Sequence, residues 1–207
     1  MTPAGRTALG VVLLFAAASA AAQRTFPMAR VLSGTLSFDA QATLGEFTGT
    51  TDSVTGQMTA AGELREVRGW VEAPVSSLKT GNGLRDKDLN KTMETETHPT
   101  MRFDLEGVSV QSEAADSAAV TLFGRFTIHG VTRELVVPAV VRYESDRIRL
   151  RSDFPMNVRD YNVTRLSRML GAFKMNPNIT VHVDLVFAPG AGASPGAAPA
   201  GTPARFE

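Results

Sequence analysis

The stretch that decides the fold is Ile179-Thr180-Val181-His182-Val183-Asp184-Leu185-Val186-Phe187, in which apolar residues alternate with polar ones as far as Leu185. Successive side chains of a β-strand point to opposite faces of a sheet, so this alternation predicts a strand with one apolar and one polar face. The same pattern occurs in Leu32–Ala40 and Val120–Ile128. Such strands are typical of antiparallel sheets that have one dry face and one wet face.

The alternation predicts strands in eight segments of the chain. They are Val31–Leu44, Phe47–Ala60, Leu64–Val75, Thr100–Val110, Ala118–Ile128, Arg133–Tyr143, Arg147–Val158 and Ile179–Phe187. So many antiparallel strands form a sandwich or a barrel, and an eight-stranded barrel is just wide enough to hold one apolar ligand. We therefore predict an all-β fold, an eight-stranded antiparallel barrel, and we place binding ahead of catalysis.

Two segments break the alternation, and each predicts a short helical insert. Between the third and fourth strands, Ser76–Pro99 is polar and contains a helical pattern at Leu84–Lys91. Before the last strand, Tyr161–Phe173 has the spacing of a second amphipathic helix. Its packed side would carry Leu166, Met169, Leu170 and Phe173.

The first residues of the chain have the pattern of a secretory signal peptide. Arg6 precedes a short apolar run, and Ala20–Ala22 forms an A-x-A cleavage site, so residues 1–22 are expected to be removed after Ala22. An uncleaved membrane anchor is the alternative, but the apolar run is too short to span a bilayer. The sequence therefore predicts a periplasmic or secreted protein.

The last residues form a separate region. Residues 189–207 read PGAGASPGAAPAGTPARFE, a composition without periodicity that cannot bury enough apolar surface to fold. We predict a disordered tail there, and the alternative is a tether to the cell wall or to a partner. The barrel is then a single domain at residues 24–188.

The composition excludes several classes of partner and mechanism. The chain has 21 basic and 21 acidic residues, and loss of Arg6 with the leader leaves one excess acid, so nothing indicates a nucleic-acid partner. There is no cysteine, which excludes thiol catalysis and disulfides, and there is no G-x-S-x-G nucleophile elbow. We predict a protein that is not an enzyme and that has no cofactor.

The three histidines do not form a metal site by spacing. His98, His129 and His182 lack the H-x-H, H-x₃-H and H-E-x-x-H patterns. His129 precedes Gly130 at the end of a predicted strand, so we interpret it as a turn residue whose ring bonds a backbone carbonyl. His182 lies on the polar face of the last strand, and we expect it to be solvated.

Two blocks of the sequence contain motifs of a known family. They are SSLKTGN at Ser76–Asn82 followed by Arg85-Asp86, Leu89 and HPTMRF at His98–Phe103, and GRFTIHGVTR at Gly124–Arg133. With Thr35–Gly49, these blocks resemble the YceI-like family of secreted lipid- and polyisoprenoid-binding proteins. The resemblance covers nearly all of Val31–Phe187. The chain departs from the pattern at Thr43, where many members have His, and at Pro155, where Gly is common.

The resemblance implies an extended lipocalin-like barrel whose interior holds a long isoprenoid or fatty chain. Burying one methylene is worth about 0.8 kcal/mol, so such a chain needs only a dry tunnel and few polar contacts. We expect the tunnel to be lined by Phe38, Leu44, Val71, Phe103, Leu105, Phe126, Ile128, Val137, Phe154, Met156 and Leu185. The alternative is that the same side chains fill a closed core.

Arg85 is the candidate contact for a ligand head group. It lies on the insert expected at the barrel mouth, where a guanidinium would suit a pyrophosphate or a carboxylate, with Lys79 or Lys91 nearby in sequence. The alternative is a structural pair between Arg85 and Asp86 that holds the insert on the barrel.

The resulting functional hypothesis is a non-catalytic binding or carrier protein for an isoprenoid or another fatty lipid. A second hypothesis is a closed barrel that acts as an envelope stress or interaction protein without a lipid of its own. A third is an enzyme that acts on a lipid substrate. The oligomeric state, including a homodimer, stays open.

Overall fold

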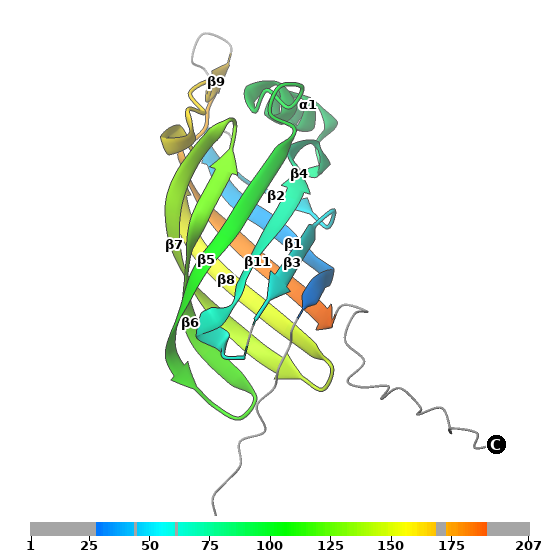
Figure 1. Ribbon diagram of the computed structural model, residues 1–207. Coiled ribbons are helices and arrows are strands. Elements are labelled where there is room, and N and C mark those ends of the chain that lie inside the picture. The colour runs from blue at the N-terminus through cyan, green and yellow to red at the C-terminus, as the bar shows by residue number, and fades with distance from the viewer. Residues whose placement is uncertain (1–27, 44, 61, 169–172, 190–207) are drawn as a thin grey trace, which may run out of the picture.

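The computed structural model describes residues 28–43, 45–60, 62–168 and 173–189, whose strands curve into a barrel (Figure 1). The strands of the barrel wall are β1 (Ala29–Ala42), β2 (Gly45–Thr51), β3 (Thr55–Thr59), β4 (Arg68–Pro74), β5 (Thr100–Glu113), β6 (Ser117–Ile128), β7 (Val131–Glu144), β8 (Arg147–Asn157) and β11 (Asn178–Pro189). All the pairings between them are antiparallel.

The barrel closes between its first and last strands. On one side, β1 pairs with β11 from Ala29↔Pro189 to Asp39↔Thr180. On the other side, Ala29 and Arg30 of β1 pair with β3, and Leu36–Ala42 pair with β2. The ring is therefore β1-β11-β8-β7-β6-β5-β4-β3, with β2 as one extra strand. This confirms the predicted eight-stranded antiparallel barrel. The predicted strand Phe47–Ala60 is divided into β2 and β3.

One helical insert covers an end of the barrel, as predicted. After the 3-10 helices η1 (Leu64–Glu66) and η2 (Val75–Ser77), the helix α1 spans Gly83–Thr92. Asn82 caps α1, because its side chain accepts hydrogen bonds from the backbone N–H groups of Leu84 and Arg85 at 3.0 and 3.2 Å. In Figure 1, α1 lies over the end of the barrel away from the β5–β6 connection.

The prediction of a helix over Tyr161–Phe173 is wrong for the described part of that segment. A 3-10 helix, η3 (Val158–Tyr161), ends at Asn162, whose left-handed φ of 59° stops helical hydrogen bonding. The next elements are β9 (Ser167–Arg168) and β10 (Phe173–Lys174), which pair with each other. Met169 and Leu170 lie outside the described residues. Apolar spacing alone did not distinguish a short helix from a folded-back segment that supplies single side chains to the same core.

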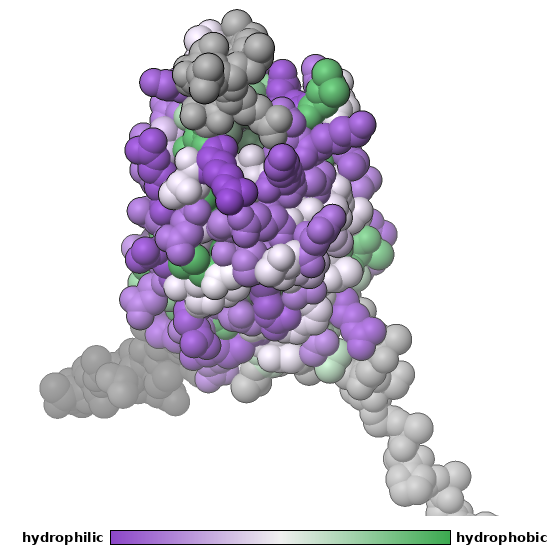
Figure 2. All heavy atoms as spheres, turned by 90° about the horizontal axis from the view of Figure 1, so that it is seen from above, coloured by the Kyte–Doolittle hydropathy of each residue, from purple (hydrophilic) through white to green (hydrophobic). Residues whose placement is uncertain are grey.

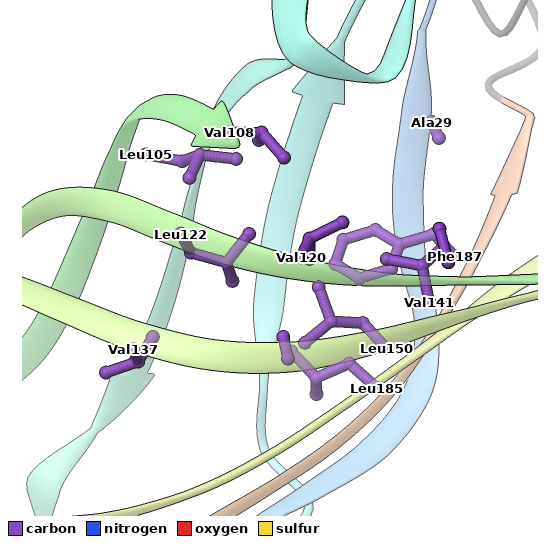
Figure 3. Close-up of a cluster of buried hydrophobic side chains, with 12 residues drawn as sticks. Ala29, Leu105, Val108, Val120, Leu122, Val137, Val141, Leu150, Leu185 and Phe187 are labelled. Carbon is purple, nitrogen blue, oxygen red and sulfur yellow. The ribbon is translucent and has the colours of Figure 1, made fainter. Parts of the chain in front are cut away.

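Apolar side chains pack together in the half of the barrel away from α1. Figure 3 shows residues from β6, β7, β8 and β11 gathered around the ring of Phe187. Phe187, Leu185 and Val120 are at most 2% exposed. Burying a large apolar side chain contributes about 1.5–3 kcal/mol, so this half supplies much of the stability of the fold.

The face of the molecule seen in Figure 2 is mostly hydrophilic. Seen from above, the described hydrophobic residues occur in separate spots on it (Figure 2). Among the described residues, the exposed large apolar side chains are Leu32, Leu84, Phe123, Val136 and Val140. In the described part of the chain, no helix is both long and apolar enough to cross a bilayer.

Candidate functional site

The half of the barrel next to α1 is hollow. A cavity of about 750 Å³ extends inward from α1 and is lined by mostly apolar side chains. Ligand pockets typically measure about 300–1,000 Å³. Leu36, Leu135 and Val183 point into the barrel yet are only half-buried, because the cavity leaves part of their surface without contact. In this half, the cavity agrees with the expected ligand space and not with the alternative of a completely filled core.

Two rows of side chains face each other across the cavity. On one wall, strand pairing places Phe38, Val181 and Phe154 side by side on β1, β11 and β8. On the opposite wall, Val71, Phe103 and Phe126 are neighbours on β4, β5 and β6. Each row contains two phenylalanines, so the ligand space lies between aromatic surfaces.

Ten of the eleven residues that the sequence predicts for the tunnel line this cavity. They are Phe38, Val71, Phe103, Leu105, Phe126, Ile128, Val137, Phe154, Met156 and Leu185. Leu44 lies outside the described residues. Contact of these side chains with a lipid stays a prediction.

The sequence reasoning missed lining residues of two kinds. Val181 and Val183 alternate with polar residues in the same strand as Leu185, so their inward direction could have been inferred from the pattern. Met93, Leu166 and Met175 come from segments without a strand period. Only the tertiary structure brings these three to the cavity.

Arg85 lies at the opening of the cavity. Its guanidinium carbon is 4.4 Å from the centre of the Phe47 ring, a cation–π contact, and both residues line the cavity. Arg165 and Lys174 line the same region, together with the carboxylates of Glu46 and Asp88. The opening therefore combines apolar, cationic and anionic groups, whereas the interior is apolar.

Asp86 does not pair with Arg85 as the structural alternative assumed. Its carboxylate accepts hydrogen bonds from the backbone N–H and the hydroxyl of Thr80, at 2.9 and 2.7 Å. These bonds, above all the one from the hydroxyl, lower the pKa of Asp86 below its usual value. Asp86 thus links α1 to the segment that precedes it within the insert, while Arg85 stacks on Phe47.

Hydrogen bonds to β2 fasten the insert to the barrel wall. The backbone groups of Thr50 on β2 and of Lys79 exchange two hydrogen bonds of 2.9 Å each. In addition, the hydroxyls of Thr51 and Ser77 are 2.7 Å apart. The segment before α1 therefore continues the sheet along the edge of β2. It also fixes where α1 stands over the cavity.

The histidine at the β6–β7 turn has the structural role that the sequence predicts. His129 has a left-handed φ of 53°, and its Nδ1 is 3.1 Å from the carbonyl oxygen of Tyr161. This bond links the turn to η3. The ring of Tyr161 packs edge-on against Phe126, with ring centres 5.5 Å apart.

His182 is bound by two carboxylates, so the expectation of simple solvation is wrong. It lies on the outer face of β11, where its Nδ1 is 2.5 Å from Asp153 and its Nε2 is 3.1 Å from Asp39. These contacts raise the pKa of His182, with Asp153 as the larger cause. Among the described residues, no three acidic or histidine side chains are arranged to hold a metal ion.

Comparison with solved structures gives several barrels of the same fold. BcnA of Burkholderia cenocepacia is 13% identical with a TM-score of 0.63, and the match covers 74% of this chain and 95% of BcnA. A polyisoprenoid binding domain from Saccharophagus degradans, implicated in plant cell wall breakdown, is 16% identical with a TM-score of 0.64, covering 78% of this chain and 98% of that domain. The YceI protein of Campylobacter jejuni is 15% identical with a TM-score of 0.52, and the match covers 67% of this chain and 82% of that protein.

Comparison with protein families gives a direct assignment. No curated protein matches the chain. The family model of the YceI-like domain, however, matches residues 29–187, from the first residue of β1 to Phe187 in β11. The chain therefore belongs to the YceI-like family.

Proposed function

We propose that this protein binds and carries an isoprenoid or another long-chain lipid inside the barrel without chemical conversion. The observation that carries the proposal is the apolar cavity of about 750 Å³ between the two aromatic rows. Each methylene moved from water into such a space contributes about 0.8 kcal/mol. An unbranched or isoprenoid chain would therefore gain its affinity from length, with few polar contacts.

Two comparisons support this function. The chain belongs to the YceI-like family, and one structural neighbour is a polyisoprenoid binding domain. A binding role also fits the cavity wall, in which Ser152 is one of the few polar side chains away from the opening. The site would hold a chain rather than activate one.

The proposed place of action is the periplasm or the cell exterior. This part of the proposal rests on residues 1–22, whose sequence has the order of a secretory signal peptide, and these residues lie outside the described structure. A lipid carrier outside the cytoplasm would shield its cargo from water between two membranes or surfaces.

Mass spectrometry of organic extracts tests the proposal directly. The mature protein would be purified from its native envelope without detergent, and its extract compared with that of a mock purification. A stoichiometric isoprenoid or fatty lipid is the expected result, and it would identify the cargo. A clean extract, together with no uptake of added lipid, would contradict the proposal and favour the envelope interaction protein. Turnover of an added lipid that is lost on replacing Arg85 or His98 would instead favour an enzyme.

A further inference from the structure

The cavity next to α1 does not extend along the full length of the barrel interior. A second, more polar hollow of about 1100 Å³ lies at the opposite end, beside η1 and the β5–β6 connection. The residues that line both hollows are Met58, Leu105, Leu122 and Leu150. These four side chains therefore lie at the boundary between the two spaces.

Three of these four boundary residues are buried leucines, and we refer to them as the leucine layer. Leu105, Leu122 and Leu150 come from β5, β6 and β8 and are only 6%, 6% and 7% exposed. Figure 3 shows them within the same buried cluster as Val120 and Phe187, which lie on the far side of the layer. By contrast, Phe103, Phe126 and Phe154, which precede the layer from the α1 end, are only half-buried.

The distance from the opening to the leucine layer follows from strand geometry. On β6, the inward-facing positions run from Ile128 through Phe126 and Gly124 to Leu122. Six residues of strand span about 20 Å, or about 15 Å along the barrel axis at the usual tilt of barrel strands. A fully extended chain that reaches this layer can be buried no further without moving a leucine.

We propose that Leu105, Leu122 and Leu150 are the residues that set the longest apolar chain the cavity can bury. The proposal rests on the proposed lipid-binding function and adds to it a limit on chain length. Removing the side chain of Leu122 lengthens the cavity toward the second hollow. Removing an equal volume from the side wall widens the cavity and leaves its depth unchanged.

The affinity for a lipid should therefore rise with the length of its chain up to a limit and stay constant beyond that limit. Up to the limit, each added methylene strengthens binding about fourfold, the equivalent of the transfer free energy of one methylene. Beyond the limit, additional methylenes protrude and bring no further gain. In Leu122→Ala, the fourfold steps should continue for two or more further methylenes.

Native mass spectrometry can measure this limit. The delipidated mature protein is incubated with an equimolar mixture of saturated fatty acids from decanoic to tetracosanoic acid, and the occupancy of each length is read. Leu122→Ala is compared with two controls. Leu135→Ala removes the same number of carbons from a residue that lines the α1-side cavity and not the second hollow. Val120→Ala shortens a buried side chain that lines the second hollow and not the α1-side cavity. Leu122→Val provides a milder change if the alanine variant does not fold.

The expected result is a limit that moves to longer chains in the Leu122 variants and stays at the wild-type length in both controls. An unchanged limit in a folded Leu122 variant would overturn the proposal that this residue helps to set the longest chain that the cavity buries. An equal shift in Leu135→Ala would also overturn it, because total volume and not depth would then set the limit. If the wild-type protein bound no member of the series and no added prenol, the proposed function itself would fail.

Discussion

The ring of Phe103 lies against Gly124 on the neighbouring strand, in the space that a side chain at position 124 would occupy. A Cβ atom added to Gly124 would be 2.6 Å from Cζ of Phe103, and it would also collide with the backbone carbonyl of Asp104. Gly49 has the same relation to Phe38, whose Cζ would be 2.6 Å from an added Cβ. Glycines in two strands thus leave room for one aromatic ring on each wall of the cavity.

Replacing Gly124 with Ala is expected to destabilise the barrel. The methyl group must displace both the Phe103 ring and the backbone of β5, and such overpacking typically costs about 1–3 kcal/mol. Thermal or urea unfolding would measure the loss. Gly83→Ala is the matched control, because no atom lies within 4 Å of its added Cβ and alanine favours the helix. Equal stability of the two variants would contradict the packing described for Phe103.

Replacing Phe126 with Arg is expected to abolish lipid binding. Phe126 lines the cavity, and a guanidinium there would place a charge where the chain of the ligand should lie. Phe123→Arg is the control on the same strand, since Phe123 is 41% exposed on the outer face. Lipid recovered per mole of purified protein would be compared, with circular dichroism to verify folding. Unchanged lipid content in a folded Phe126→Arg variant would remove this residue from the binding site.

Replacing Arg85 with Ala is expected to affect anionic ligands selectively. A hydrogen bond to a charged group contributes about 1.5–3 kcal/mol, so affinity for a long-chain acid or prenyl phosphate should fall roughly tenfold or more. Affinity for the corresponding alcohol should change little. Displacement of a fluorescent fatty probe would measure both ligands, and Lys87→Ala, an exposed change on α1, is the control. An equal loss for acid and alcohol would indicate that Arg85 only positions the insert.

The contacts of His182 predict a pH-dependent contribution to stability. The pKa of His182 is raised from 6.5, so its contribution is fully present below that pH and is lost as the pH rises through the higher pKa of the folded state. The pKa of Asp39 is lowered from 3.8, first by the hydroxyl of Thr48 and then by His182. The contribution of Asp39 is therefore present above pH 3.8 and is lost in stronger acid.

The measurement is the unfolding midpoint of the wild type and His182→Gln across pH. Their difference should be largest between pH 3.8 and 6.5 and should shrink as the pH rises above that window. Because Asp39 and Asp153 are exposed and His182 is only half-buried, solvent screens these pairs and the expected difference is at most about 1 kcal/mol. A difference that is the same at every pH would show that His182 contributes through packing alone.

Local sequence was sufficient to predict the strands and most of the cavity wall. Phe103, Phe126 and Phe154 each lie in an alternating segment, and a period of two assigns every second side chain to the interior once a sheet closes. The helix before Met93 was also predictable, because Asn82 caps it through bonds to residues two and three positions away. These features depend on neighbours in sequence.

The tertiary structure alone decided two other features. Asp39 and His182 are 143 residues apart in sequence, and only the closure of β1 on β11 brings them within 3.1 Å. The fold of the segment after Asn162, where a helix was predicted, depends on long-range packing that apolar spacing does not encode.

The sequence by itself determined which residues face inward, because the direction of each side chain follows from its position along a strand. Whether the interior is hollow was decided by the tertiary structure. Phe126 and Val120 lie on the same face of β6, yet Phe126 is half-buried beside the cavity whereas Val120 is only 2% exposed. Their different burial depends on how many side chains from the other strands meet at each height of the barrel. The total volume of the side chains at each height is set by the strand register and the barrel radius. Neither of these can be read from a single segment of the chain.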